Sequence, residues 1–212
     1  MIYTISNLTM KNGSVYTNKA EFHKRQGNID GACAVYCLMM CLLHLNYIDE
    51  EDLDVYNFPN RKTSKGKLLY ELLENKGLIK GGYSYTTLKK DIENACGKDL
   101  IVSRFAPRTQ ERIVDKIGDQ IDEDVPPIIS IVWEDGAHAL LAIGIEVDDK
   151  DKITKILCLD PSSEKPQVSY WNCYLEVSKL KGDYPIKCVS INESPFKCKL
   201  GDLLIIEKLK LE

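Results

Sequence analysis

Apolar residues change their spacing about halfway along the chain, which indicates a change of secondary structure. In the first half they recur at helical spacing over residues 64–76, 86–96 and 109–121. From residue 128 onward the pattern is typical of short strands, over residues 128–133, 137–147, 153–160, 168–177, 186–191 and 203–209. A short strand is also predicted over 100–105, and an edge strand or hairpin over 2–16. Helices first and strands second predict an α+β fold with a helical side and an antiparallel sheet side.

The longest apolar run lies between Ala32 and Leu43, directly after a polar, glycine-containing loop. A helix that is apolar on every side is expected in the middle of a domain. Asn28 or Asp30 is the natural N-cap for this helix, which places Cys33 in its first turn. Free backbone N–H groups and the positive end of the helix dipole favour a thiolate at that position.

Length, composition and charge limit the classes of function. The 212 residues suit one domain over 1–212, with a mainly helical subregion at 1–124 and a mainly sheet subregion at 125–212. A net charge of −4 without a basic cluster gives no reason to expect nucleic acid or an anionic membrane as a partner. Because no signal peptide and no apolar run of ~20 residues is present, we expect a cytoplasmic protein without membrane insertion.

The eight cysteines contain no CxxC pair, so neither a zinc ribbon nor a thioredoxin-like site is predicted, and we expect reduced thiols. Cys33, Cys37 and Cys41 follow one another at four-residue spacing in the apolar run. Iron–sulfur loops usually have closer spacings and lie outside apolar helices, so no cluster is expected here. We interpret Cys37 and Cys41 as core residues. No metal or cofactor is therefore expected.

The three histidines differ in what surrounds them. His23 has charged neighbours on both sides, which predicts a solvated surface position. His44 lies near the end of the apolar helix, about three turns from Cys33, and is too far away to act as its base. His138 opens the long strand at 137–147, and Asp160 ends the next strand.

The position of the loop between these two strands determines which of their residues face each other. If the loop over 148–152 is centred on Lys150, Leu140 faces Asp160 across the ladder. His138 shares a face with Leu140, because side chains alternate with a period of two. Asp160 then lies diagonally beside His138, within reach of one ring nitrogen. A slip of one residue would turn the two side chains to opposite faces.

These motifs resemble those of the papain-like cysteine proteases, and most closely their compact bacterial branch, which includes peptidases that remove double-glycine leaders from bacteriocins. That pattern has a glutamine shortly before a cysteine at a helix N-terminus, a histidine opening a strand, and Asn or Asp ending the next. The matching stretches within roughly residues 20–165 are QGNIDGAC at 26–33, Ala137-His138-Ala139-Leu140 and Leu159-Asp160-Pro161. Ala32 departs from the pattern, in which an acidic residue, Ser or Gly often precedes the cysteine.

The resemblance implies a papain-like fold and an enzyme that cleaves a peptide or protein substrate through a thioester. Cys33 would be the nucleophile and His138 the general base and then the acid. Asp160 would orient the imidazole. Gln26 and the Cys33 backbone N–H would form the oxyanion hole.

Each residue also has a plain structural interpretation. Cys33 suits a buried helix, His138 a strand opening, Asp160 a turn, and Gln26 a loop. The occurrence of all four residues together in this order favours a catalytic site over four separate structural roles. The same four residues suit an acyltransferase, a transglutaminase or a glutamine deamidase, and a non-catalytic binding module with this fold is the alternative from another class. Trp133 and Trp171 are expected either to line a substrate groove or to pack in the sheet.

Overall fold

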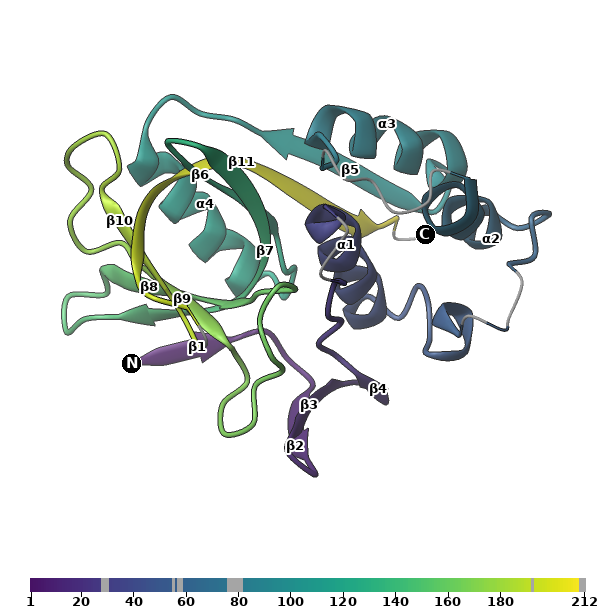
Figure 1. Ribbon diagram of the computed structural model, residues 1–212, viewed down its shortest axis with the longest axis horizontal. Helices are drawn as coiled ribbons and strands as arrows, with labels where there is room; N and C mark the ends of the chain where they lie inside the picture. The colour runs from purple at the N-terminus through teal and green to yellow at the C-terminus, as the bar shows by residue number, and fades with distance from the viewer. Residues whose placement is uncertain (28–30, 55, 57–58, 76–81, 192, 210–212) are drawn as a thin grey trace.

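The computed structural model describes residues 1–27, 31–54, 56, 59–75, 82–191 and 193–209 (Figure 1). Its helices are Cys33–His44 (α1), Ser64–Leu69 (α2), Tyr85–Cys96 (α3) and Gln110–Asp122 (α4), with a 3-10 turn at Glu51–Leu53 and a π-helical turn at Tyr70–Asn75. Its strands are Ile2–Thr4 (β1), Leu8–Lys11 (β2), Ser14–Thr17 (β3), Ala20–Glu21 (β4), Leu100–Phe105 (β5), Ile128–Trp133 (β6), Gly136–Val147 (β7), Ile153–Leu159 (β8), Cys173–Glu176 (β9), Ile186–Ser190 (β10) and Phe196–Lys208 (β11).

The large sheet closes on itself. The strands pair in the order β7-β6-β11-β10-β9-β8, and β8 pairs again with β7, so that six strands form a ring (Figure 1). Strand β1 adds to β7, and β5 adds to the far end of β11. Strands β2, β3 and β4 form a separate small sheet. All of these pairings are antiparallel, as predicted.

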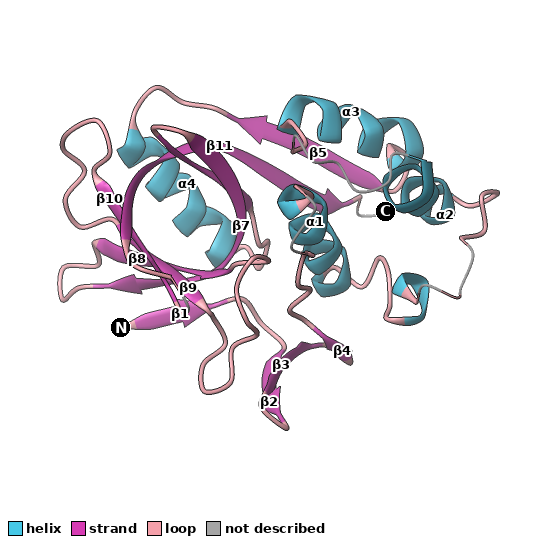
Figure 2. Ribbon diagram, viewed as in Figure 1, coloured by secondary structure: helices cyan, strands magenta, loops and turns pink. Residues whose placement is uncertain are grey.

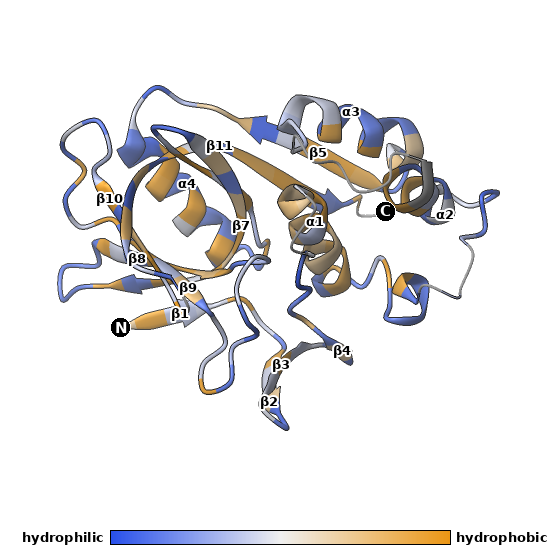
Figure 3. Cartoon of the chain, viewed as in Figure 1, coloured by the Kyte–Doolittle hydropathy of each residue, from blue (hydrophilic) through white to orange (hydrophobic). Residues whose placement is uncertain are grey.

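Helix α1 lies where the helical side meets the ring of strands (Figure 2). It packs against β6 and β7, and ten of its twelve residues are buried. Most of it has apolar colours, whereas α4 shows both apolar and polar residues (Figure 3). Burying a helix with so few polar positions is favoured by removal of its apolar surface from water. The predicted α+β class, with a central buried helix on an antiparallel sheet, is therefore confirmed.

Most predicted elements agree with the structure to within a few residues, and two strands differ more. The last strand, predicted from residue 203, begins at Phe196. Its first half alternates exposed lysines with buried Cys198 and Leu200, so the lysines are the solvent face of a strand and not a loop. The strand predicted over 168–177 covers only Cys173–Glu176. The predicted helix end at Gly77 lies outside the described residues.

None of the helices in the described part of the chain has the length and apolarity needed to cross a membrane.

Strand β7 is buried without interruption from Ala139 to Ile145, because α1 and α4 pack against it and its other face lies in the ring. Gly144 lets β1 approach this strand closely: a Cβ atom there would lie 2.6 Å from the carbonyl oxygen of Tyr3.

We expect Gly144→Ala to lower the free energy of unfolding by ~1–3 kcal/mol, because the new methyl group overpacks the β1–β7 contact. Urea unfolding measures the change. Gly201→Ala is the matched control: its Cβ would lie 3.1 Å from Ser130 Oγ, a side-chain atom that can rotate away. Equal destabilisation by the two variants would contradict this explanation.

Candidate active site

Cys33 is the first residue of α1 and is half-buried. This confirms its predicted place in the first turn of the helix. The predicted N-cap is wrong, because Ala32 occupies that position and provides no side-chain cap. Asn28 and Asp30 themselves lie outside the described residues. The helix therefore begins with backbone N–H groups that no side chain at the N-cap satisfies, beside the thiol.

His138 and Asp160 come from the β7–β8 hairpin, in the register predicted from the sequence. Leu141 pairs with Leu159, which is the expected alignment at the site end of the hairpin. Two irregularities interrupt the ladder, one after Ala142 and one after Glu146. The first shifts the register by one residue and the second shifts it back between the loop and the site. The simple hairpin count is thus correct at both ends of the ladder, although the middle departs from it.

Three of the predicted site residues form one chain of interactions. His138 Nε2 lies 2.8 Å from Asp160 Oδ1. The thiol of Cys33 lies near enough to the same imidazole ring for each group to shift the pKa of the other. Since Nε2 is engaged by the carboxylate, Nδ1 is the nitrogen left for the sulfur. A thiol from a helix N-terminus therefore meets an imidazole delivered by the sheet, and a carboxylate orients that imidazole.

The pKa shifts of these groups favour a charged pair. Burial opposes ionisation of the Cys33 thiol, but hydrogen bonds from His138 and from the backbone at Ala139 and Ala34 lower its pKa below the ordinary value. Burial also disfavours a charged His138, yet its hydrogen bonds to Asp160 and Cys33 raise its pKa to about 10. Because the imidazole holds the proton more tightly than the thiol does, the expected resting state is thiolate and imidazolium.

Asp160 is the most enclosed member of the chain, with 3% of its surface exposed. Burial raises its pKa, but hydrogen bonds from His138 and from the side chain and backbone of Ser162 outweigh it and hold the pKa at about 2. The hydroxyl and backbone N–H of Ser162 donate to Oδ1 at 2.7 and 2.8 Å, and the Ser163 hydroxyl donates to Oδ2 at 3.2 Å. The carboxylate therefore stays ionised at neutral pH.

Gln26 lies beside this chain without joining it. Its backbone N–H donates to the carbonyl oxygen of Pro161 at 2.9 Å, next to Asp160. Its side chain is half-buried, and within the described residues its Oε1 has no hydrogen-bond partner. The structure therefore brings Cys33, His138 and Asp160 together, and it places Gln26 at the neighbouring turn with its amide uncommitted to them.

Two buried polar residues at the site were not predicted. His23 was expected at the surface, but it is 6% exposed, and its Nε2 lies 2.8 Å from the carbonyl oxygen of Asp160. Asn172, 2% exposed, accepts from the backbone N–H of Asp160 at 2.7 Å and donates to its carbonyl oxygen at 2.9 Å. The charged neighbours of His23 point elsewhere: Lys24 pairs with Glu50 and Arg25 with Glu164. No spacing in the sequence relates His23 or Asn172 to Asp160.

A pocket of about 360 Å³ opens beside His138 and Asp160. Its apolar wall includes Ile131, Trp133 and Phe196, and the two aromatic rings meet edge to face at 5.3 Å. Trp133 thus both packs in the sheet and lines the pocket, which combines the two roles considered for it. Trp171 is half-buried against the core.

The other cysteines are unsuited to nucleophilic chemistry. Cys37 and Cys41 are fully buried in α1, as predicted, and burial raises the pKa of both thiols. All eight cysteines are free thiols. Among the described residues, no group of three or more His, Cys, Asp or Glu side chains is arranged to hold a metal ion.

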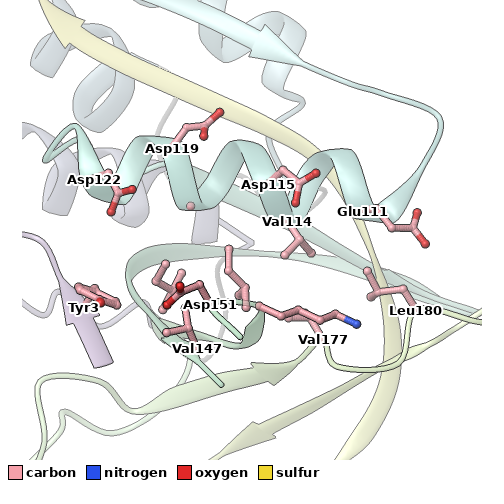
Figure 4. Close-up of a pocket in the computed structure, with 14 residues that line it drawn as sticks. Tyr3, Glu111, Val114, Asp115, Asp119, Asp122, Val147, Asp151, Val177 and Leu180 are labelled. Atoms are coloured by element: carbon pink, nitrogen blue, oxygen red, sulfur yellow. The ribbon is translucent and has the colours of Figure 1, made fainter. Parts of the chain in front are cut away.

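A larger groove of about 630 Å³ lies at the opposite end of β7, where α4 passes the β7–β8 loop (Figure 4). Glu111, Asp115, Asp119 and Asp122 follow one edge of it along α4. Val147 lies on its other side, nine positions along β7 from His138, which is ~30 Å for an extended strand. Within the part of the chain that the structure describes, its lining contains no cysteine or histidine.

Comparisons with known proteins add little to this description. No protein-family model matches the sequence, and no curated protein sequence matches it. Among solved structures, UfSP from C. elegans is similar over 99% of this chain and 34% of that one, with a TM-score of 0.47 and 14% sequence identity. The chain thus spans about a third of the length of that structure. A likeness this distant carries no argument about activity.

We expect Cys33 to react with iodoacetamide with a pH midpoint below the ordinary thiol value of ~8.5. His138→Ala should move the midpoint upward, because burial then acts on the thiol without the hydrogen bond that opposes it. Cys96→Ala removes a buried thiol that does not belong to the Cys33–His138–Asp160 chain, and it should leave the pH profile of alkylation unchanged. A midpoint at or above the ordinary value in the unmodified protein would contradict the charged pair.

We also expect Asp160→Asn to lower the pKa of His138, because the hydrogen bond to the carboxylate is the main contribution that raises it. The imidazole then competes less well for the Cys33 proton, so the pH midpoint of Cys33 alkylation should move upward. NMR titration of the His138 ring provides the second measurement. Asp124→Asn, which removes a carboxylate 3.5 Å from His44, should change neither result.

Proposed function

We propose that this protein is a papain-like cysteine peptidase that hydrolyses a peptide bond through a thioester on Cys33. The observation that carries this proposal is the chain Cys33–His138–Asp160, in which a thiol at a helix N-terminus contacts an imidazole held by a buried carboxylate. A structural cysteine needs no histidine beside it. A buried thiol, imidazole and carboxylate are costly to assemble without a function, because burying charged groups is unfavourable.

In the proposed reaction, the Cys33 thiolate attacks the carbonyl carbon of the scissile peptide bond. Negative charge moves from sulfur to the carbonyl oxygen, where the Cys33 backbone N–H and the side-chain amide of Gln26 stabilise it. His138 then donates its proton to the leaving nitrogen, the C–N bond breaks, and the acyl group remains on sulfur. Water attacks the thioester while His138 takes its proton, and the thiolate is regenerated with release of the acid.

The pocket beside His138 suits the part of the substrate that leaves with the amine. His138 must contact the leaving nitrogen to protonate it, so the residue attached to that nitrogen lies within a few bonds of the imidazole. Trp133, Phe196 and Ile131 offer an apolar wall at that place. We therefore propose an apolar side chain directly after the scissile bond.

The sequence motifs extend the proposal to a narrower class. QGNIDGAC resembles the compact bacterial branch that includes peptidases acting on double-glycine leaders, and we keep that branch as the working assignment. A single domain over 1–212 and a cytoplasmic location remain predictions of the same kind.

The proposal is tested by comparing protein N-termini in cells that express the intact protein or Cys33→Ala. We expect new N-termini that share a sequence pattern and depend on Cys33, with Cys96→Ala behaving as the intact protein does. Purified candidate substrates are then followed by mass spectrometry. Splitting of the chain supports a peptidase, whereas a small mass shift of an intact chain would instead indicate deamidation or acyl transfer. Absence of every Cys33-dependent product, together with ordinary Cys33 reactivity, would indicate a binding module.

A further inference from the structure

The segment that leads into α1 is joined to the turn that carries Asp160 along a continuous line of contacts. His23, Arg25 and Gln26 contact Asp160, Glu164 and Pro161 respectively. We call this line the seam. It connects the loop that bears the proposed oxyanion donor to the turn after β8, which bears Asp160.

The contacts of the seam differ in strength. Arg25 and Glu164 form an ion pair at 2.6 Å, but both side chains are about half exposed, so water and salt weaken it. The hydrogen bond of His23 to the Asp160 carbonyl is buried, and buried hydrogen bonds are expensive to break because the freed groups cannot reach water. His23 is therefore a buried fixed point of the loop that bears Gln26, in addition to the hydrogen bond that the Gln26 backbone N–H donates to Pro161.

Asn172 fixes the backbone of Asp160 from the sheet side. Its amide binds both the N–H and the carbonyl oxygen of Asp160, and it also donates to the carbonyl oxygen of Glu164 at 2.9 Å. The carbonyl that His23 contacts is thus held in place by the sheet side. Gln26 is only three residues beyond His23, and its buried Oε1 has no partner in the described part of the chain that would hold the side chain in its place.

We propose that His23 is a positioning residue that places the Gln26 amide for oxyanion stabilisation by anchoring its loop to the backbone of Asp160. This inference rests on the proposed function and adds a residue that the Cys33–His138–Asp160 chain does not contain. His23 touches neither substrate nor sulfur. Its effect is confined to the step that develops charge on a carbonyl oxygen, and Cys33 ionisation does not depend on it.

Two reactions of the same sulfur separate these effects. In alkylation by iodoacetamide, the thiolate forms a C–S bond and iodide leaves, so no oxyanion forms. In acylation by 4-nitrophenyl acetate, the thiolate attacks the ester carbonyl, an oxyanion forms and collapses, and 4-nitrophenolate leaves while the acetyl group stays on sulfur. The ratio of the acylation rate to the alkylation rate therefore reports oxyanion stabilisation alone.

We expect Gln26→Ala to lower this ratio by ~10²–10³, the usual effect of removing an oxyanion donor. His23→Ala should lower it by ~10–100-fold, because a small misplacement of a catalytic group has an effect of this size. The variant with both substitutions should resemble Gln26→Ala to within ~2-fold, since His23 acts through Gln26 and the two effects are not independent. Alkylation should keep its rate and pH profile in all three.

The remaining variants separate positioning from general stability. His23→Gln retains an N–H donor and should recover most of the ratio. His23→Phe fills the space without a donor, so it should lower the ratio as His23→Ala does. If His23→Ala does not fold, His23→Phe provides the same test. Lys24→Ala alters the neighbouring side chain, which pairs with Glu50 outside the seam, and should leave the ratio unchanged.

Several results would overturn the inference while leaving the peptidase proposal intact. They are an unchanged ratio in His23→Phe and His23→Ala, a parallel fall of both rates, or effects of His23 and Gln26 that multiply in the double variant. An unmodified protein that is not acylated at Cys33 by the ester would instead overturn the proposed function, and the inference with it.

Discussion

The carboxylate of Asp160 is a negative charge placed where almost no water reaches it, and much of the site follows from the need to satisfy it. An isolated ionised carboxylate is strongly disfavoured in such a place unless partners and hydrogen bonds surround it. Here His138 and the hydroxyls of Ser162 and Ser163 serve the oxygens, while Asn172 and His23 serve the backbone. Apart from the neighbouring serines, these partners come from different parts of the chain. The contacts of Asp160 therefore bring a sheet edge, a turn, a loop and the approach to α1 into fixed relation.

Helix α1 provides the complementary constraint. Its apolar faces have to be covered by β6 and β7, so the helix cannot shift along the sheet without exposing core residues. Cys33 is consequently held at one place relative to the start of β7, where His138 lies. A thiol in a surface loop would lack this fixed distance. The packing that stabilises the fold is thus the same packing that brings sulfur and imidazole into contact.

The part of this arrangement that the sequence predicts is the part that depends on local pattern. The apolar run after a polar loop locates Cys33, and the period of two in a hairpin relates His138 to Asp160. That count succeeded because the irregularities after Ala142 and Glu146 offset each other, which no local pattern indicates. His23 and Asn172 were missed because their partner is 137 and 12 residues away, and the neighbours of His23 suggested solvent. Closure of the sheet into a ring likewise depends on pairings between distant strands.

The charges along Asp160, His138 and Cys33 explain why the same arrangement of side chains suits every step of the proposed reaction. Along Asp160, His138 and Cys33 the expected charges alternate as negative, positive and negative, so each group stabilises its neighbour. The last negative charge lies at the positive end of the α1 dipole. When the thiolate attacks a carbonyl, that charge moves only from sulfur to an oxygen beside the same helix terminus. The field that favours the thiolate therefore also favours the oxyanion, and the site needs no large rearrangement between the two states.

The two states differ in what they require of Gln26. Its side-chain amide has no role toward the sulfur, but it must lie where it can donate a hydrogen bond to the oxyanion. A rigid connection between its loop and the Asp160 turn meets that demand, and the buried hydrogen bond of His23 contributes to it together with the hydrogen bond of the Gln26 backbone to Pro161.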